Sequence, residues 1–109
     1  MNDRKLLGAL GEEMAVSILY AQGFDIEERN YTCRHGEIDI IARRGQELAF
    51  VEVKTRMEPM LGRPSEAVTR QKQKRMRRIA GEYTCYKRLD VYVTFQVIEI
   101  SVNQIENAF

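Results

Sequence analysis

Residues 36–54 constrain the fold of this chain more than any other stretch, because they read as two short strands joined by a tight turn. Residues 37–42 are rich in isoleucine, and residues 48–53 are almost entirely apolar. The residues between them, 43–46, have the composition of a turn, so we predict a β-hairpin. Charged groups are costly to bury unless they are paired, hydrogen-bonded or bound to metal. Charges inside these apolar runs therefore indicate a use for them.

Three charged residues interrupt the two runs: Asp39 in the first, and Glu52 and Lys54 at the end of the second. Side chains two residues apart share a strand face, so Glu52 and Lys54 point the same way. A Gly45-Gln46 turn or a four-residue loop has an even length and pairs odd positions with even ones, which brings Asp39 to the same face. A three-residue loop without a compensating bulge would not.

Two carboxylates and an ammonium group on one face suit metal-assisted hydrolysis. Asp39 and Glu52 offer the hard oxygen ligands that Mg²⁺ or Mn²⁺ prefers. Such a metal polarises a phosphate and activates a water molecule. Lys54 can lie near the attacking water or stabilise developing negative charge. The alternative is a structural salt bridge on a solvated sheet face.

Length and composition predict one globular domain spanning residues 1–109, with 30% charged and 44% hydrophobic residues. Cys33 and Cys85 form no metal-binding spacing with the single histidine, His35, and we expect reduced thiols and a surface histidine. No signal-peptide core or membrane-length apolar run is present in the sequence. We therefore expect a cytoplasmic protein that does not enter a membrane.

Residues 69–88 hold eight basic residues and one acidic residue, although the net charge of the chain is only +1. A local basic patch on a near-neutral protein points to an anionic partner, and a nucleic acid is the expected one. At helical spacing the candidate contacts form two clusters. These are Lys74, Arg77 and Arg78, and separately Lys72 and Arg75. The alternative is a solvated helix face.

The N-terminal residues predict a helix that starts at Asn2 or Asp3 and runs to about Gln22, with Gly23 just past its end. Leu7, Leu10, Met14 and Ile18 form the expected apolar stripe. Glu12 lies at the edge of that stripe. Gly8 and Gly11 beside it suggest that a backbone or a ligand approaches closely there. The alternative for Glu12 is an ordinary carboxylate favoured by the helix dipole.

The remaining segments predict a strand over 24–30, a polar connection over 31–35 and a loop over 55–64. A second helix is expected from a Ser65 cap to about Tyr83. Two strands, 89–94 and 96–101, can form a hairpin, with Ile105 and Phe109 as anchors after it. The order of helices and strands predicts an α/β sandwich whose mixed sheet has a helix on each side.

These residues also match a known pattern over nearly the whole chain. The matching segments are Gly11-Glu12, Gly23-Phe24, Asn30-Tyr31, Gly36-Glu37-Ile38-Asp39, Phe50-Val51-Glu52-Val53-Lys54-Thr55-Arg56, Glu66-Ala67-Val68, Lys72 and Ile105-Glu106-Asn107-Ala108-Phe109. The chain thereby resembles the YraN-like family of small bacterial proteins, predicted nucleases similar to archaeal Holliday junction resolvases. Asp39 and Glu52-Val53-Lys54 look like the PD-(D/E)XK nuclease signature, with Ile38 in place of the usual proline.

The resemblance implies a restriction-endonuclease-like fold and Mg²⁺- or Mn²⁺-dependent hydrolysis of phosphodiester bonds in structured or branched DNA. Asp39 and Glu52 would hold the metal, Lys54 would assist the attacking water, and Glu12 would complete the site. Resolvases act as dimers on two-fold-symmetric junctions, so the resemblance also suggests a homodimer. The sequence itself has no independent signal for one. The segment 81–88, between the second helix and the next strand, looks short for the family. The resemblance therefore does not define the nucleic-acid channel. The alternative function is a nucleic-acid-binding module of nuclease fold without cleavage activity.

Overall fold

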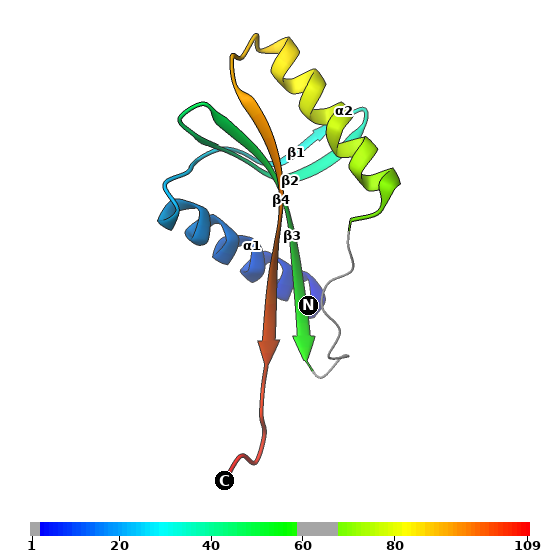
Figure 1. Cartoon of the computed structure of the whole chain (residues 1–109). Helices are drawn as coiled ribbons and strands as arrows, with labels where there is room; N and C mark the ends of the chain where they lie inside the picture. Colours follow the sequence, from blue (N-terminus) through cyan, green and yellow to red (C-terminus); the bar gives the residue numbers. More distant parts are fainter. Residues whose placement is uncertain (1–2, 59–67) are drawn as a thin grey trace.

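A four-stranded mixed sheet with one helix packed on each face makes up the structure (Figure 1). The computed structural model describes residues 3–58 and 68–109. Its elements, in chain order, are α1 (Asp3–Ala21), β1 (Asp25–Cys33), β2 (Gly36–Arg44), β3 (Glu47–Glu58), α2 (Arg70–Tyr86) and β4 (Tyr92–Asn103). The strands lie in the order β1-β2-β3-β4, antiparallel except for the parallel pair β3 and β4. The predicted α/β sandwich is confirmed and is consistent with a restriction-endonuclease-like fold.

The central hairpin has the predicted two-residue turn. Arg44 pairs with Glu47, so Gly45 and Gln46 form the connection. Gly45 has a φ of +60°, a value that glycine adopts without steric cost and that the first position of a tight hairpin turn requires. The pairing continues with odd positions opposite even ones, as predicted for an even loop.

Each helix covers one face of the sheet with its own hydrophobic core. The α1-side core contains Ala15, Leu19, Phe24, Ile40, Ala42, Ala49 and Val51. The α2-side core contains Ile38, Ile41, Leu48, Phe50, Met76, Ile79, Ala80 and Tyr83. Alternate residues of β3 therefore face opposite helices, as the period of a strand requires. This alternation decides which helix each charged residue of β3 can reach.

The apolar stripe predicted for α1 is wrong at Leu10 and Met14, whereas its other two members, Leu7 and Ile18, are half-buried. Leu10 and Met14 are 54% and 52% exposed, whereas Ala15 and Leu19 are fully buried and Gly11 packs beside them. Small residues on this face let the helix axis come close to the sheet, so hydrophobicity alone did not identify the buried face. The predicted end of the helix is confirmed, because Gly23 follows it with a φ of +91°.

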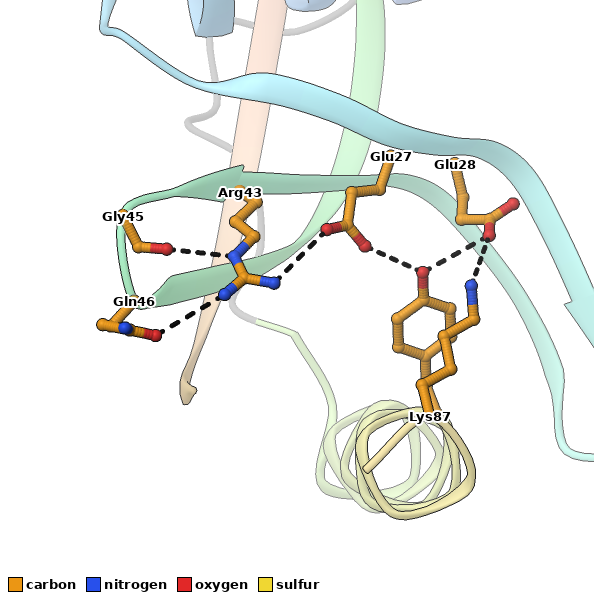
Figure 2. Close-up of polar contacts among 7 residues, drawn as sticks. Glu27, Glu28, Arg43, Gly45, Gln46 and Lys87 are labelled. Carbon is orange, nitrogen blue, oxygen red and sulfur yellow. Dashed lines mark hydrogen bonds and ion pairs between the residues drawn. The ribbon is translucent and has the colours of Figure 1, made fainter. Parts of the chain in front are cut away.

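A polar cluster ties the end of α2 to β1 (Figure 2). The hydroxyl of buried Tyr83 donates to Glu27 Oε2 at 3.0 Å and Glu28 Oε2 at 3.3 Å. Consecutive strand residues normally face opposite sides, but an irregularity between Ile26 and Glu28 lets both carboxylates reach one hydroxyl. Lys87 also contacts Glu28, with Nζ 3.5 Å from Oε2. These contacts fix the last turn of α2 over the sheet.

Several predicted boundaries differ from the structure. Residues 31–33 belong to β1, and the C-terminal segment forms the single strand β4 instead of a hairpin. Ile105 is 71% exposed and Phe109 is fully exposed, so neither anchors the chain. Helix α2 has Thr69 as its N-cap and runs to Tyr86, while the predicted Ser65 cap lies outside the described residues.

Candidate active site

Strands β2 and β3 part at one point of the sheet, here called the fork. Their mutual pairing ends at Ile40 and Val51, although both strands continue. Past this point, within the described residues, β2 pairs with β1 alone and β3 with β4 alone (Figure 1). Asp39 and Glu52 are the first residues beyond the last pair, one on each branch. The sheet itself therefore brings these two predicted site residues together.

A hydrogen bond to the opposite branch holds Asp39 at the fork. The backbone N–H of Val53 donates to Asp39 Oδ2 at 2.8 Å, and this bond joins the two branches. Burial raises the pKa of the Asp39 carboxyl, the Val53 hydrogen bond lowers it, and the Glu52 and Glu12 carboxylates raise it further. Carboxylates from α1, β2 and β3 thus lie close enough to repel one another.

The side chain of Asp39 opens toward α1. The alternation of β2 breaks at this residue, because Ile38 belongs to the α2-side core and Ile40 to the α1-side core although they are two residues apart. Asp39 lines a cavity of about 650 Å³ together with Glu12, and we call it the carboxylate cavity. The prediction that Asp39 and Glu52 share one face of the sheet is therefore wrong, because Glu52 faces α2.

Glu52 is buried, with 9% of its surface exposed, and meets a lysine of α2. Its Oε2 atom forms an ion pair with Lys72 Nζ but makes no hydrogen bond of acceptable geometry. Lys54 follows two residues later in a regular part of β3, so it lies on the same side as Glu52. It is half-buried, and no ion pair joins it to any residue that the structure describes.

Glu12 reaches the carboxylate cavity from the buried side of α1. Its Oε1 atom is buried and accepts no hydrogen bond, and it lies 3.6 Å from Arg29 Nη2. Arg29 makes a closer contact of 2.6 Å with the neighbouring Glu13, which is exposed. Glu12 therefore lines the carboxylate cavity with a buried oxygen and does not point into bulk solvent.

The three carboxylates have the chemistry of a site for a hard divalent cation. Glu12 Oε1 and Glu52 Oε2 are the two buried side-chain oxygens without a hydrogen bond among the described residues. Together with Asp39 they form a cluster of like charge, which a cation would neutralise. As they stand, no three acidic, histidine or cysteine side chains in residues 3–58 and 68–109 are arranged to hold a metal. Carboxylate oxygens are nevertheless the donor type that a hard divalent cation prefers, and the Glu52 oxygen is occupied by its ion pair with Lys72.

A second cavity, of about 500 Å³, lies beside the first turns of α2 and is lined largely by cations. We call it the basic cavity, and its lining is His35, Thr69, Gln71, Lys72, Lys74, Arg75 and Arg78. The stem of Arg75 lies over Gly36, where an added Cβ would stand only 2.8 Å from Arg75 Cδ. Arg77 instead lines a separate cavity with Phe95 and Val97 of β4. The predicted grouping of Arg77 with Lys74 and Arg78 is therefore wrong.

Comparison with known proteins adds the family. The model of the uncharacterised protein family UPF0102 matches residues 11–100. The chain belongs to this family. A UPF0102 protein of Caldicellulosiruptor saccharolyticus is 41% identical over 119 aligned residues, covering 100% of both chains. A UPF0102 protein of Alkaliphilus oremlandii is 43% identical over 96% of this chain and 98% of its own length. The matched range includes the fork, the basic cavity, every candidate site residue and the part of the carboxylate cavity from Glu12 onward.

Two residues make contacts in this UPF0102 chain that its sequence did not reveal. Lys72 was predicted to contact nucleic acid, and its ion pair with Glu52 arises only from the packing of α2 over β3. His35 was expected at the surface, but it is half-buried, lines the basic cavity and has Nε2 2.7 Å from Glu82 Oε2. Neither contact has a local sequence signal. No helix in the described part of this UPF0102 chain is long and apolar enough to cross a membrane.

Proposed function

We propose that the protein is a metal-dependent nuclease that hydrolyses phosphodiester bonds in structured or branched DNA. The observation that carries this proposal is the convergence of Glu12, Asp39 and Glu52 at the fork from three separate elements. Buried carboxylates of like charge destabilise a fold unless a positive charge compensates them. A module that only binds nucleic acid has no need of such a cluster. The cluster therefore favours hydrolysis over the alternative of binding without cleavage.

The residues divide into distinct roles. Asp39 and Glu52 would hold Mg²⁺ or Mn²⁺, with Glu12 in support, and the Val53 N–H keeps Asp39 oriented. When bound, the ion would polarise a phosphate and lower the pKa of a water molecule. Lys54 would bring an ammonium group to the same side of β3 as Glu52, where it stabilises negative charge that develops during hydrolysis.

The basic cavity supplies the contact to the DNA backbone in this proposal. Lys74, Arg75 and Arg78 present cationic groups around one hollow next to the α2 residue that touches Glu52. Contacts of this kind position a duplex without reading its sequence. The backbone would thus be held within reach of the carboxylates.

Cleavage of defined DNA substrates tests the proposal. Branched, flapped, linear and single-stranded DNA would be incubated with the protein in Mg²⁺ or Mn²⁺, and again with EDTA. We expect Asp39→Asn and Glu52→Gln to abolish cleavage with no loss of folding by circular dichroism. Glu13→Gln is the matched control, because this exposed carboxylate beside Glu12 lies outside the carboxylate cavity. Binding without metal-dependent cleavage of any substrate would instead establish the binding module.

Adjacent arginines of α2 test the backbone contact separately. Arg78→Gln removes a charge from the basic cavity, whereas Arg77→Gln removes the same charge from the separate cavity beside β4. We expect Arg78→Gln to lower the log–log slope of duplex binding against salt by about 0.9, the effect of one lost phosphate contact. Arg77→Gln should leave the slope unchanged. Equal slopes for both variants in fluorescence anisotropy would remove the basic cavity from the proposal.

A further inference from the structure

One lysine stands at the border between two sites of opposite charge. Lys72 Nζ is paired with Glu52 Oε2, the buried oxygen that lacks a hydrogen bond. The same residue lines the basic cavity with Lys74, Arg75 and Arg78. The side chain of Lys72 is 29% exposed, compared with 12% for that of Glu52, so the lysine is the more accessible partner of the pair. Lys72 therefore belongs to the carboxylate cluster and to the cation-lined cavity at once.

The ammonium group of Lys72 has two positions available, at Glu52 or in the basic cavity. The ions bound at these two places decide which position is favoured. A divalent cation on Glu52 would repel the ammonium group and compete for the same oxygen. The flexible four-carbon stem of lysine allows the group to turn away from Glu52 toward the basic cavity. Without an anion there, the charges of Lys74, Arg75 and Arg78 disfavour that position. A phosphate in the cavity reverses this preference.

We propose that Lys72 is a positioning residue that couples cation binding at Glu52 to phosphate binding in the basic cavity. It serves as the counter-ion of Glu52 while no divalent cation is bound, and as a phosphate contact once the cation has taken its place. The inference rests on the proposed function, because it assumes a cation at the fork. It follows that cation and phosphate each strengthen the binding of the other by the same factor.

The competing explanation is a fixed salt bridge that only fastens α2 to β3. Both explanations expect Lys72→Met to be less stable without metal, because one partner of a buried ion pair is lost. They differ in the binding of Mn²⁺. If Lys72 competes with the cation, its removal tightens Mn²⁺ binding. If the salt bridge is only structural, removing it leaves Mn²⁺ binding unchanged or weaker.

Isothermal titration calorimetry with Mn²⁺ as the probe distinguishes the two, in chloride and in sulfate of equal ionic strength. We expect Lys72→Met to bind Mn²⁺ about fivefold more tightly than wild type in chloride, the lower range of typical coupling. Sulfate, a mimic of the phosphate group, should tighten Mn²⁺ binding to wild type but not to Lys72→Met. Arg70→Met is the matched control, since Arg70 lies on α2 outside the basic cavity.

Thermal unfolding with and without Mn²⁺ provides a second readout, because each variant is compared with itself. Mn²⁺ that binds more tightly should raise the Tm of Lys72→Met by more than it raises that of wild type. Mn²⁺ binding that Lys72→Met does not tighten would overturn the coupling and leave the proposed nuclease intact. If wild-type protein binds no Mn²⁺, or if Glu52→Gln does not weaken that binding, the nuclease proposal itself is overturned, and the coupling with it.

Discussion

Gly11 lies where α1 packs tightly against Thr55 of β3. An added Cβ at Gly11 would stand 1.9 Å from Thr55 Oγ1 and 3.1 Å from Thr55 Cβ, whereas ordinary contact begins at 3.4 Å. Replacement by alanine therefore requires α1 and β3 to separate or Thr55 to leave its rotamer. Gly8, one turn earlier on the same helix, has no atom within 4 Å of the corresponding position. The two glycines thus form a matched pair.

Gly8→Ala and Gly11→Ala are expected to change the free energy of unfolding in opposite directions. Alanine in place of glycine inside a helix gains up to about 1 kcal/mol from propensity. At Gly11 this gain is opposed by overpacking, which costs about 1–3 kcal/mol in a well-packed interior. We expect Gly8→Ala to be more stable than wild type by about 0.5–1 kcal/mol, and Gly11→Ala to be less stable by about 1–2 kcal/mol.

Urea unfolding followed by circular dichroism measures both changes on the same scale. A Thr55→Ala substitution in the Gly11→Ala background removes the Oγ1 contact, so it should recover part of the loss. Recovery in the double mutant would assign the cost to this one contact. If Gly11→Ala is as stable as Gly8→Ala, α1 does not approach β3 as closely as described, and the placement of Glu12 loses its support.

Two further predictions concern the charged clusters. Tyr83→Phe keeps the buried ring but leaves Glu27 and Glu28 without their hydroxyl donor, so we expect a loss of about 1.5–3 kcal/mol in urea unfolding, the range for hydrogen bonds to charged groups; an unchanged midpoint would contradict this. Asp39→Asn should be more stable than wild type at neutral pH, because the raised pKa of Asp39 shows that the fold disfavours its charge. Since the folded protein releases this proton at a higher pH than the unfolded chain, the advantage should be complete above the raised pKa and vanish as pH falls to the ordinary value of 3.8; a constant difference from pH 3 to 7 would refute it.

The parts of the fold that followed from sequence are those with local causes. The turn at Gly45 and Gln46 follows from residue chemistry within a few positions, and the strand register follows from the turn. The end of α1 follows from Gly23 in the same way, since glycine adopts its φ of +91° freely. These features are encoded within one or two turns of chain and need no knowledge of packing.

The errors occurred where packing between distant elements decides the outcome. The buried face of α1 includes the small residues Gly11 and Ala15 beside Leu19, while Leu10 and Met14 remain exposed. A pattern of hydrophobicity selects the larger residues and therefore the wrong face. The C-terminal hairpin was wrong for a local reason, because no glycine, proline or asparagine interrupts residues 92–102.

The candidate site was predictable as a set of residues but not as an arrangement. Charged residues inside apolar runs identified Asp39 and Glu52, because a strand that carries unpaired charge needs a reason for it. Strict alternation then placed both on one face, which fails because the backbone of β2 rotates between Ile38 and Ile40. The pairing of Glu52 with Lys72 depends on how α2 crosses the sheet, and no local pattern encodes that.

The fork explains how carboxylates on opposite faces of a sheet come close enough to interact electrostatically. Within a continuous sheet, Asp39 opening toward α1 and Glu52 facing α2 would be separated by the backbone of their own strands. Beyond the last pair the two branches diverge, and the N–H of Val53 is free to bind the Asp39 side chain. The opening thus supplies a backbone donor for one carboxylate, while a lysine of α2 compensates the other. A sheet that remained paired past Ile40 would lose the first of these and, with it, the proximity on which the proposed chemistry depends.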